Sequence, residues 1–291
     1  MSDRLPPPQR IAVGAAPNLP DAPGQAQEIA RFLEERGIKT VLATSLYDAK
    51  LRKRLEAHEF DVLIALGGDG TMLRAGHLCS PLGIPILGIN LGKFGFLMEL
   101  QRQHWQEFLP RLIEGNYRLE KRMTLQASHK RGGELLGTWQ VINEAVVSRG
   151  QVVRPIRLRA QVDGYLLATF VADGLIAATA TGSTAYSLAA GGPVMPPELR
   201  NILITPVAPH MTMDRSMILP AGSCVTINAY TDHEAVLSLD GHAPEIMQNG
   251  DSVEVEAGQH DITFVRLQDP GYFYRNLTLY MEQNPSAGGV E

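Results

Sequence analysis

The chain has 291 residues, of which 44% are hydrophobic and 20% charged, an ordinary globular composition with enough length for two domains. The formal net charge of −5 leaves no broad basic excess, and no apolar run approaches the ~20 residues that cross a bilayer, so we expect neither nucleic acid nor membrane as a partner. Cys79 and Cys224 lie far apart without a CxxC pair, and no secretory leader is evident, which indicates a cytoplasmic location.

The first third of the chain alternates strand-like and helix-like segments. Strands are predicted at residues 11–14, 40–42, 62–66 and 84–89, and helices at residues 25–36, 49–56, 71–79 and 103–114. This alternation predicts an α/β domain with an open parallel sheet, covering residues 1–116. Ligands collect at the carboxyl ends of the strands in such a sheet.

The turn after the predicted strand at residues 62–66 reads GGDGT, from Gly67 to Thr71. Its glycines leave main-chain N–H groups bare before a helix N-terminus, which favours a phosphate. Asp69 would repel a phosphate, so we expect it to accept a proton from a hydroxyl that attacks one. An ordinary strand-to-helix turn with Gly and Asp remains the alternative, since neither a Walker A loop nor a GxGxxG pattern is present.

After residue 115 the pattern changes to short β-branched runs between turn signals, which predicts an all-β domain over residues 117–270. The predicted strands are residues 156–162, 165–171, 225–229, 235–239, 253–257 and 262–267. Asp163-Gly164 predicts a hairpin turn between the first two. Arg157 and Arg159 alternate with apolar residues, and we favour the solvent face of a strand over an anion site for them.

A segment rich in hydroxyl residues covers residues 173–193. Ser183 or Thr184 could N-cap a short helix that Gly191-Gly192 would end. The hydroxyl cluster followed by Tyr186 also suits a ligand rich in ribose hydroxyls and phosphate oxygens, with a base stacked on the tyrosine ring.

These segments occur with GINLGKFGFL at residues 88–97, Asn143-Glu144 and ITPVAPH at residues 204–210. In order and spacing they resemble the NAD kinases, over roughly residues 60–245. The GGDG turn alone is also similar to that of phosphofructokinases and of lipid kinases, so a lipid or sugar kinase is the enzyme alternative. A non-catalytic NAD(H) sensor is the binding alternative, although it would need an impaired base, and Asp69 is intact.

The resemblance implies transfer of a phosphoryl group to the 2′-hydroxyl of the adenosine ribose of NAD, giving NADP, in a cleft between the domains. Asp69 matches the proton acceptor, and Gly67, Gly68, Gly70 and Thr71 match the turn for the donor phosphate. The positions that match dinucleotide contacts are Asp69, Gly70, Asn143, Glu144, Arg154, Asp173, Thr184, Ala185, Tyr186, Ser187, Leu188, Ala189 and His242. His242 replaces the glutamine that is usual in the family.

The resemblance also implies ATP or another phosphoryl donor, a homodimer or homotetramer with part of the Tyr186 region near a neighbouring subunit, and a C-terminal segment, residues 271–291, that packs back on the first domain. The eight histidines are scattered without HxH or HExxH spacing, so we expect no tightly bound protein metal. Mg²⁺ is expected to arrive with the nucleotide. The donor and the acceptance of NADH stay open.

Overall fold

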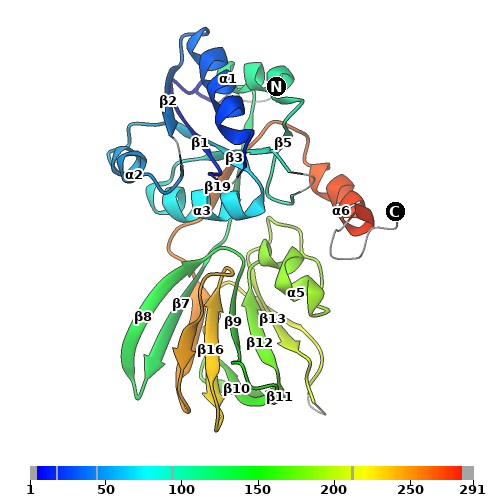
Figure 1. Cartoon of the computed structure of the whole chain (residues 1–291). Helices are drawn as coiled ribbons and strands as arrows, with labels where there is room; N and C mark the ends of the chain where they lie inside the picture. The colour runs from blue at the N-terminus through cyan, green and yellow to red at the C-terminus, as the bar shows by residue number, and fades with distance from the viewer. Residues whose placement is uncertain (1–4, 18, 44, 93–94, 211–212, 284–291) are drawn as a thin grey trace. The chain divides into compact units, whose positions relative to one another are not determined.

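The computed structural model describes residues 5–17, 19–43, 45–92, 95–210 and 213–283 (Figure 1). These residues form two compact units. The first contains the described residues up to Lys121 and from Ile262 onward, and the second is Arg122–Asp261.

The first unit is an α/β domain whose sheet has the strand order β2-β1-β3-β4-β19-β6, with β5 paired to β4. Its strands are β1 (Arg10–Ala15), β2 (Lys39–Ala43), β3 (Val62–Gly67), β4 (Ile86–Asn90), β5 (Leu100–Gln101), β6 (Arg118–Arg122) and β19 (Ile262–Arg266). β1 pairs in parallel with β2 and β3, and β4 pairs in parallel with β3, β5 and β19. The predicted parallel sheet is therefore confirmed.

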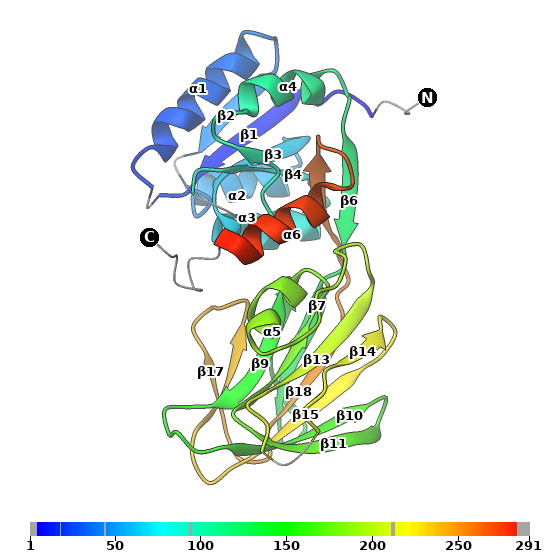
Figure 2. The same ribbon diagram turned by 90° about the vertical axis from the view of Figure 1, so that its right-hand side faces the viewer.

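Helices cover both faces of this sheet (Figure 2). They are α1 (Ala22–Glu34), α2 (Ala49–Glu56), α3 (Asp69–Cys79), the short 3-10 helix η1 (Ser80–Leu82), α4 (Trp105–Ile113) and α6 (Tyr272–Gln283). α1 and α4 pack Ile29, Leu33 and Leu109 against Ile64 on one face. α3 packs on the other face, where a Cβ on Gly88 would lie 2.7 Å from the Met72 sulfur.

The second domain predicted from the sequence, residues 117–270, extends too far at both ends. β6 and β19 belong to the sheet of the first unit, where Phe264 of β19 pairs with Ile86 of β4. An apolar β-branched run has the same pattern in a parallel and in an antiparallel sheet, so the sequence did not assign β19 to its sheet. The segment after residue 271 contributes α6 to the first unit.

The second unit is a sandwich of two antiparallel sheets. One has the order β11-β10-β15-β18-β7-β8, with β7 (Leu125–Arg131), β8 (Glu134–Val141), β10 (Ile156–Val162), β11 (Tyr165–Ala172), β15 (Val225–Tyr230) and β18 (Ser252–Ala257). The other has the order β14-β13-β12-β9-β16-β17, with β9 (Glu144–Arg149), β12 (Gly174–Ala178), β13 (Asn201–Val207), β14 (Met217–Pro220), β16 (Ala235–Leu239) and β17 (Glu245–Met247). Two short helices follow β12, the 3-10 helix η2 (Gly182–Thr184) and α5 (Tyr186–Ala189).

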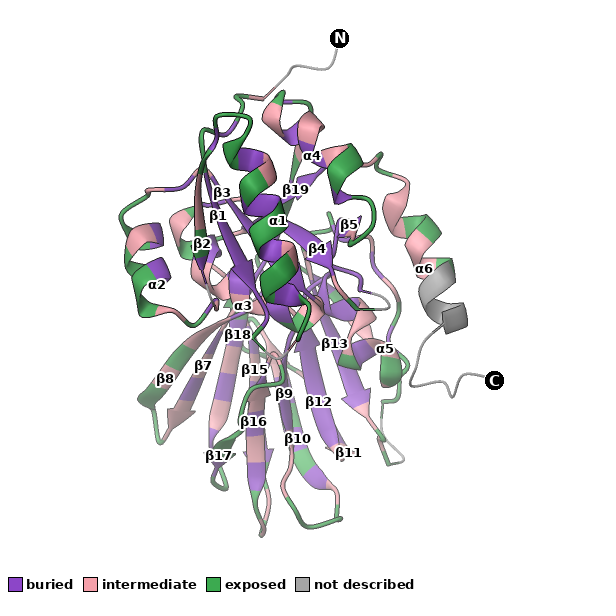
Figure 3. Ribbon diagram, turned by 45° about the horizontal axis from the view of Figure 1, so that its top comes forward, coloured by how far each residue is buried: buried purple, intermediate pink, exposed green. Residues whose placement is uncertain are grey.

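One hydrophobic core lies between the two sheets, and Leu158, Phe170, Val147 and Leu237 contribute to it from strands of both. The central strands β9 and β12 are almost entirely buried (Figure 3). Asp163 and Gly164 have φ values of 51° and 83°, as a tight hairpin turn between β10 and β11 requires, so the predicted hairpin is confirmed.

Candidate active site

The GGDGT turn joins β3 to α3 in the first unit. Gly68 is the N-cap of α3, and its N–H donates to Thr71 Oγ1 at 3.4 Å. A Cβ on Gly67 would lie 2.1 Å from Thr71 Oγ1, so a glycine is needed where the helix folds back over the strand end. The helix begins at Asp69, two residues before the predicted start at Thr71, and this puts Asp69 in its positive first turn.

The turn lies where ligands collect in an open α/β sheet. The chain passes from β1 to β2 on one side of β1, whereas β3 pairs with the other side. The connection after β1 therefore leads to one side of the sheet, and the connection after β3 leads to the other side, toward β4. The carboxyl ends of β1 and β3 thus form a topological switch point. Gly70 is exposed there and Asp69 is half-buried.

The Asp69 carboxylate is held by the main chain of a distant segment. Oδ2 accepts the N–H of Phe96 at 2.9 Å, and Oδ1 accepts the N–H of Leu97 at 3.0 Å. A Cβ on Gly95 would lie 2.6 Å from Asp69 Oδ1, so Gly95 permits this close approach. Sequence reasoning missed this contact, for which the glycine in the block at residues 88–97 was the available signal.

Asn143 and Glu144 lie in the second unit, at the break between β8 and β9. β8 ends at Val141 and β9 begins at Glu144, so Asn143 lies in the break and Glu144 is the first residue of β9. The break is fixed by Asp240, whose carboxylate accepts the N–H groups of Ile142, Asn143 and Glu144 at 2.8, 2.7 and 3.1 Å. Asp240 follows β16 with a φ of 48°. No motif or spacing in the sequence indicates this role for Asp240.

The Glu144 side chain is buried, with 7% of the residue exposed. Burial and the nearby charge of Asp240 raise the pKa of this carboxyl to about 8, and a hydrogen bond from the main chain of Tyr186 opposes the rise. Oε2 is buried without a hydrogen-bond partner among the described residues. An acceptor in this state is suited to a hydroxyl donated by a ligand.

The hydroxyl-rich turn beside Asn143 uses most of its hydroxyls internally. Thr179 Oγ1 donates to Ile142 O at 2.6 Å, Ser183 Oγ donates to Ala180 O at 2.7 Å, and Thr184 Oγ1 donates to Thr181 O at 3.1 Å. A Cβ on Gly182 would lie 2.1 Å from Asn143 O, so the turn packs directly on the Asn143 main chain. These three hydroxyls therefore help to hold the turn, and the expectation that the cluster suits a ligand stays a prediction.

Tyr186 and its neighbours follow this turn. Tyr186 is 46% exposed, which leaves its ring available for stacking, and Ala189 is also exposed. Ala185 and Leu188 are half-buried. Ser187 is buried, and its Oγ lies 2.9 Å from Thr205 Oγ1, so this hydroxyl has a partner within the protein.

The predicted helix end and helix cap at this segment have different outcomes. Ala185 is the N-cap of α5, without a side-chain bond, so the prediction of Ser183 or Thr184 as N-cap was wrong. Gly191 has a φ of 85° just beyond α5, which confirms the predicted end of the helix.

Asp173 and Arg154 lie at the other end of the same sheet from Glu144. Asp173 precedes β12, where Gly174 pairs with Ser148, whereas Ala178 at the far end pairs with Glu144. Four residue steps along a strand correspond to about 14 Å. Arg149 Nε lies 3.1 Å from Asp173 Oδ1, and Arg154 Nη2 donates to Asp232 Oδ1 at 2.6 Å. Within one unit, the fold does not bring these predicted contacts together with Glu144.

His242 is exposed two residues after Asp240, at the Glu144 end of the sheet, and its N–H donates to Leu239 O at 2.9 Å. It therefore shares a turn with the aspartate that holds Asn143.

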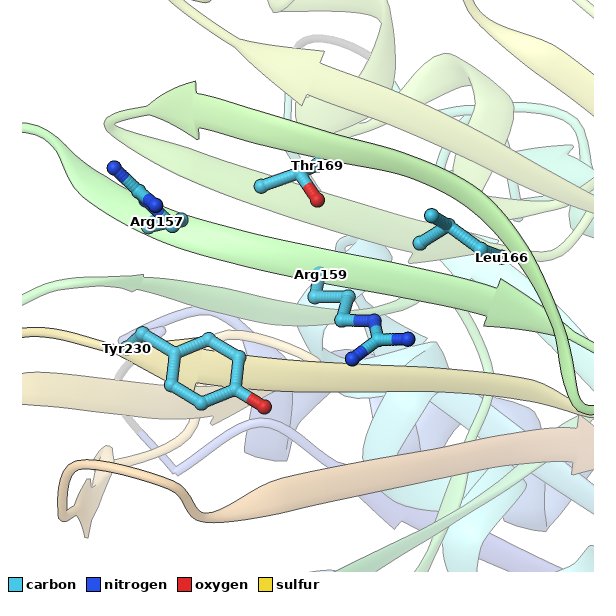
Figure 4. Close-up of a pocket in the computed structure, with 5 residues that line it drawn as sticks. All are labelled: Arg157, Arg159, Leu166, Thr169 and Tyr230. Atoms are coloured by element: carbon cyan, nitrogen blue, oxygen red, sulfur yellow. The ribbon is translucent and has the colours of Figure 1, made fainter.

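Arg157 and Arg159 project from the outer face of β10 (Figure 4). Both are exposed and alternate with buried Ile156 and Leu158, so the predicted solvent face is confirmed. Together with Leu166, Thr169 and Tyr230 they line a shallow pocket of about 480 Å³.

Other sequence expectations concern cysteines, metals and membranes. Cys79 is buried, whereas Cys224 is only partly buried, and both are free. Within the part of the chain that the structure describes, no group of His, Cys, Asp or Glu side chains is placed to hold a metal ion. In the same part, no helix is both long and apolar enough to span a membrane.

The first unit thus offers a glycine-rich turn with a fixed carboxylate at a helix N-terminus, and the second offers a buried carboxyl group near an exposed tyrosine ring. An α/β unit and a β-sandwich unit with these groups define the class of phosphotransferases that act on a hydroxyl-bearing nucleotide.

Comparison with known proteins agrees with this class. Residues 16–117 match the model of the ATP-NAD kinase N-terminal domain, and residues 142–267 match that of the ATP-NAD kinase C-terminal domain. The chain is 38% identical to an NAD kinase from Heliobacterium modesticaldum, covering 91% of this chain and 97% of the relative. It is 36% identical to an NAD kinase from Chloroflexus aurantiacus, covering 95% and 99%.

Solved structures share the fold. The yeast NADH kinase complexed with NADH superposes with a TM-score of 0.82 at 23% identity, over 100% of this chain and 90% of that one. An NAD kinase from Archaeoglobus fulgidus in complex with ATP gives a TM-score of 0.74 at 24% identity, over 92% and 97%.

The chain belongs to the NAD kinase family, whose members phosphorylate NAD to NADP. The family, the fold class and the enzyme activity predicted from the sequence are therefore confirmed. The matches favour neither a lipid or sugar kinase nor a non-catalytic sensor.

Proposed function

We propose that Asp69 accepts the proton of the 2′-hydroxyl of the adenosine ribose of NAD while that oxygen attacks the terminal phosphorus of the donor. The observation that supports this role is the fixed position of the Asp69 carboxylate. Asp69 is the first residue of α3, and its carboxylate accepts the N–H groups of Phe96 and Leu97. One main-chain hydrogen bond to each oxygen fixes the orientation of the carboxylate. A base held in place before the reaction needs little reorganisation during it.

The donor phosphate binds the turn formed by Gly67, Gly68, Gly70 and Thr71. Support comes from the exposed Gly70 and from the positive end of α3, which together favour an anion. We propose ATP as the donor, since the matching family models are those of ATP-NAD kinases and the Archaeoglobus fulgidus structure contains ATP. Mg²⁺ would accompany the nucleotide and neutralise charge on its phosphates, because this ion prefers phosphate oxygens and water to a protein cage.

NAD binds through residues at the Glu144 end of the second unit. The unpartnered Oε2 of Glu144 accepts a ribose hydroxyl, the amide of Asn143 hydrogen-bonds the dinucleotide, and the exposed ring of Tyr186 stacks on a base. His242, in the neighbouring turn, replaces the family's glutamine as a contact.

A homodimer or homotetramer accounts for the remaining predicted contacts. Asp173 and Arg154 lie at the far end of the sheet from Glu144 in the same copy, and a second copy supplies them to the dinucleotide. Mixing an Asp69→Asn protein with an Asp173→Ala protein tests this arrangement, since mixed oligomers would regain activity that neither variant has alone. Size-exclusion chromatography with light scattering gives the oligomeric state. A cytoplasmic location stays a prediction.

The proposed donor and acceptor are tested by measuring NADP formation. The purified chain is incubated with NAD and Mg²⁺ and with ATP, GTP or polyphosphate in turn, and ATP is expected to give the highest rate. NADH in place of NAD tests the reduced acceptor. A higher rate with polyphosphate than with ATP would refute the proposed donor.

A further inference from the structure

The segment from Gly95 to Glu99 touches Asp69 on one side and the C-terminal part of the first unit on the other. Its Phe96 and Leu97 N–H groups donate to the Asp69 carboxylate. The carbonyl groups of Leu97, Met98 and Glu99 accept hydrogen bonds from side chains of the C-terminal segment. Arg266 Nη1 donates to Leu97 O at 3.4 Å, Tyr272 Oη to Met98 O at 2.6 Å, and Gln268 Nε2 to Glu99 O at 2.5 Å.

The Glu99 side chain fixes the C-terminal segment to the same place. Its Oε1 accepts the N–H groups of Leu267 and Gln268, each at 2.7 Å, and its Oε2 accepts Arg266 Nη1 at 3.1 Å. Arg266 is buried and also donates to Glu120 Oε1 at 3.0 Å, so its charge is compensated on both sides. Moving any of these partners away would leave an uncompensated buried charge. The ion pairs therefore keep the C-terminal segment against Glu99.

Tyr272 is the member of this network whose donor group can be removed with the smallest change in shape. Burial and the charge of Glu99 raise the pKa of its phenol to about 12, and the charge of Asp69 adds to the rise. The hydroxyl therefore keeps its proton at neutral pH and donates to Met98 O. Met98 is separated from Tyr272 by 174 residues in sequence and lies directly after the two residues that hold Asp69, and the hydroxyl also hydrogen-bonds the Asn276 side chain on the same helix.

We propose that Tyr272 is a positioning residue for Asp69. By fixing the Met98 carbonyl it restrains the adjoining peptides, and with them the Phe96 and Leu97 N–H groups that orient the Asp69 carboxylate. Gly95 permits the close approach to Asp69, and a glycine adds backbone freedom, so the segment depends on contacts on its other side. This inference rests on the role proposed for Asp69, and a small displacement of a catalytic group is enough to slow a reaction considerably.

The experiment compares Tyr272→Phe with the wild-type chain in NADP formation. The variant loses the hydroxyl alone, and kcat is expected to fall on the order of 10-fold while KM for NAD stays within about 2-fold, because the base and not the substrate site is displaced. The matched control is Tyr274→Phe on the same helix, whose ring is exposed and whose kcat is expected to stay unchanged. The assay runs well below the Tm of every variant, so reduced stability does not enter the comparison.

A double-mutant cycle separates this inference from the role of Asp69. In an Asp69→Asn background, Tyr272→Phe is expected to cause no further loss of kcat, because its effect passes through the carboxylate. Normal kcat in a folded Tyr272→Phe protein, a change in KM alone, or the same fold-loss in both backgrounds would overturn the inference. If Asp69→Asn itself keeps near-normal kcat, the role of Asp69 fails first, and that result is visible without Tyr272.

Discussion

Asp240 Oδ1 accepts the N–H of Asn143 at 2.7 Å, so a turn 97 residues later in the chain sets the main chain of a predicted substrate contact. The same carboxylate also accepts the N–H groups of Ile142 and Glu144. Its negative charge contributes to the raised pKa of the Glu144 carboxyl.

Asp240→Asn is expected to lower stability and to raise KM for NAD. The asparagine amide would place N–H groups against the Ile142 N–H, and a buried donor without an acceptor costs about 1–3 kcal/mol. Thermal denaturation and NAD kinetics measure the two effects. Asp163→Asn is the control, since Asp163 also has positive φ in a turn and accepts the Cys224 N–H, and this turn joins two strands of the sheet that does not contain Glu144. Equal KM values for the two variants would contradict a role of Asp240 in substrate binding.

Glu144 should make stability pH-dependent. Its pKa is about 8 in the folded chain, well above the ordinary value of 4.5 for a glutamate carboxyl, so the folded state retains the proton that the unfolded state releases. The stability that it contributes is complete below about pH 4.5 and is lost as the pH rises through about 8. The loss is of the order of a few kcal/mol, since one pKa unit corresponds to about 1.4 kcal/mol.

Glu144→Gln tests that pH dependence, because the amide has no charge to bury. Between pH 5 and pH 8.5, without NAD, the Tm of the wild type is expected to fall more than the Tm of the variant. Parallel Tm curves across this range would show that Glu144 does not carry the effect.

Asp69→Asn is expected to reduce kcat by about 10²–10⁴-fold, the usual effect of losing a general base, while NAD binding is retained. Turnover and NAD affinity, the latter by calorimetry, are measured on the same preparation. Asp48→Asn is the control, because Asp48 caps α2 through the Lys50 N–H and should affect only local stability. A folded Asp69→Asn protein with near-normal kcat would refute the assignment of the base.

Gly95→Ala should also lower kcat, because the added Cβ would lie 2.6 Å from Asp69 Oδ1 and would displace the carboxylate or the segment. Gly24→Ala in α1 meets nothing within 4 Å and is expected to leave kcat unchanged. Steady-state kinetics of both alanine variants provides the comparison. Equal kcat values would mean that Asp69 tolerates a shift of its neighbour.

His242→Gln restores the residue that is usual in the family and is expected to keep KM for NAD within about 3-fold, since Gln provides an acceptor as well as donors. His242→Ala should raise KM. His104→Ala is the control, because His104 is exposed in the first unit and its side chain makes no cap bond to α4. An unchanged KM in His242→Ala would remove His242 from the set of substrate contacts.

The sequence alone predicted the elements whose pattern is local. The alternation of apolar segments gave β1 to β4 and the helices between them, and Asp163-Gly164 gave its hairpin, since these depend on side-chain periodicity and backbone freedom within a few residues. The tight GGDGT turn before a helix was also predictable, because glycines permit such a turn without help from distant residues. The family resemblance added the candidate site residues.

Tertiary structure decided which segments meet. A hydrophobic run indicates that a strand is buried, but it does not indicate which sheet contains the strand. For this reason β19 was expected in the β-rich domain, whereas it pairs with β4 in the first unit. Polar side chains likewise do not show their partners in the sequence. Thr179 and Ser183 hold their own turn, Asp240 holds Asn143, and the Phe96 N–H reaches Asp69 across 27 residues. These contacts require the path of the folded chain, because hydrogen-bond partners are selected by distance and direction in space and not by separation in sequence.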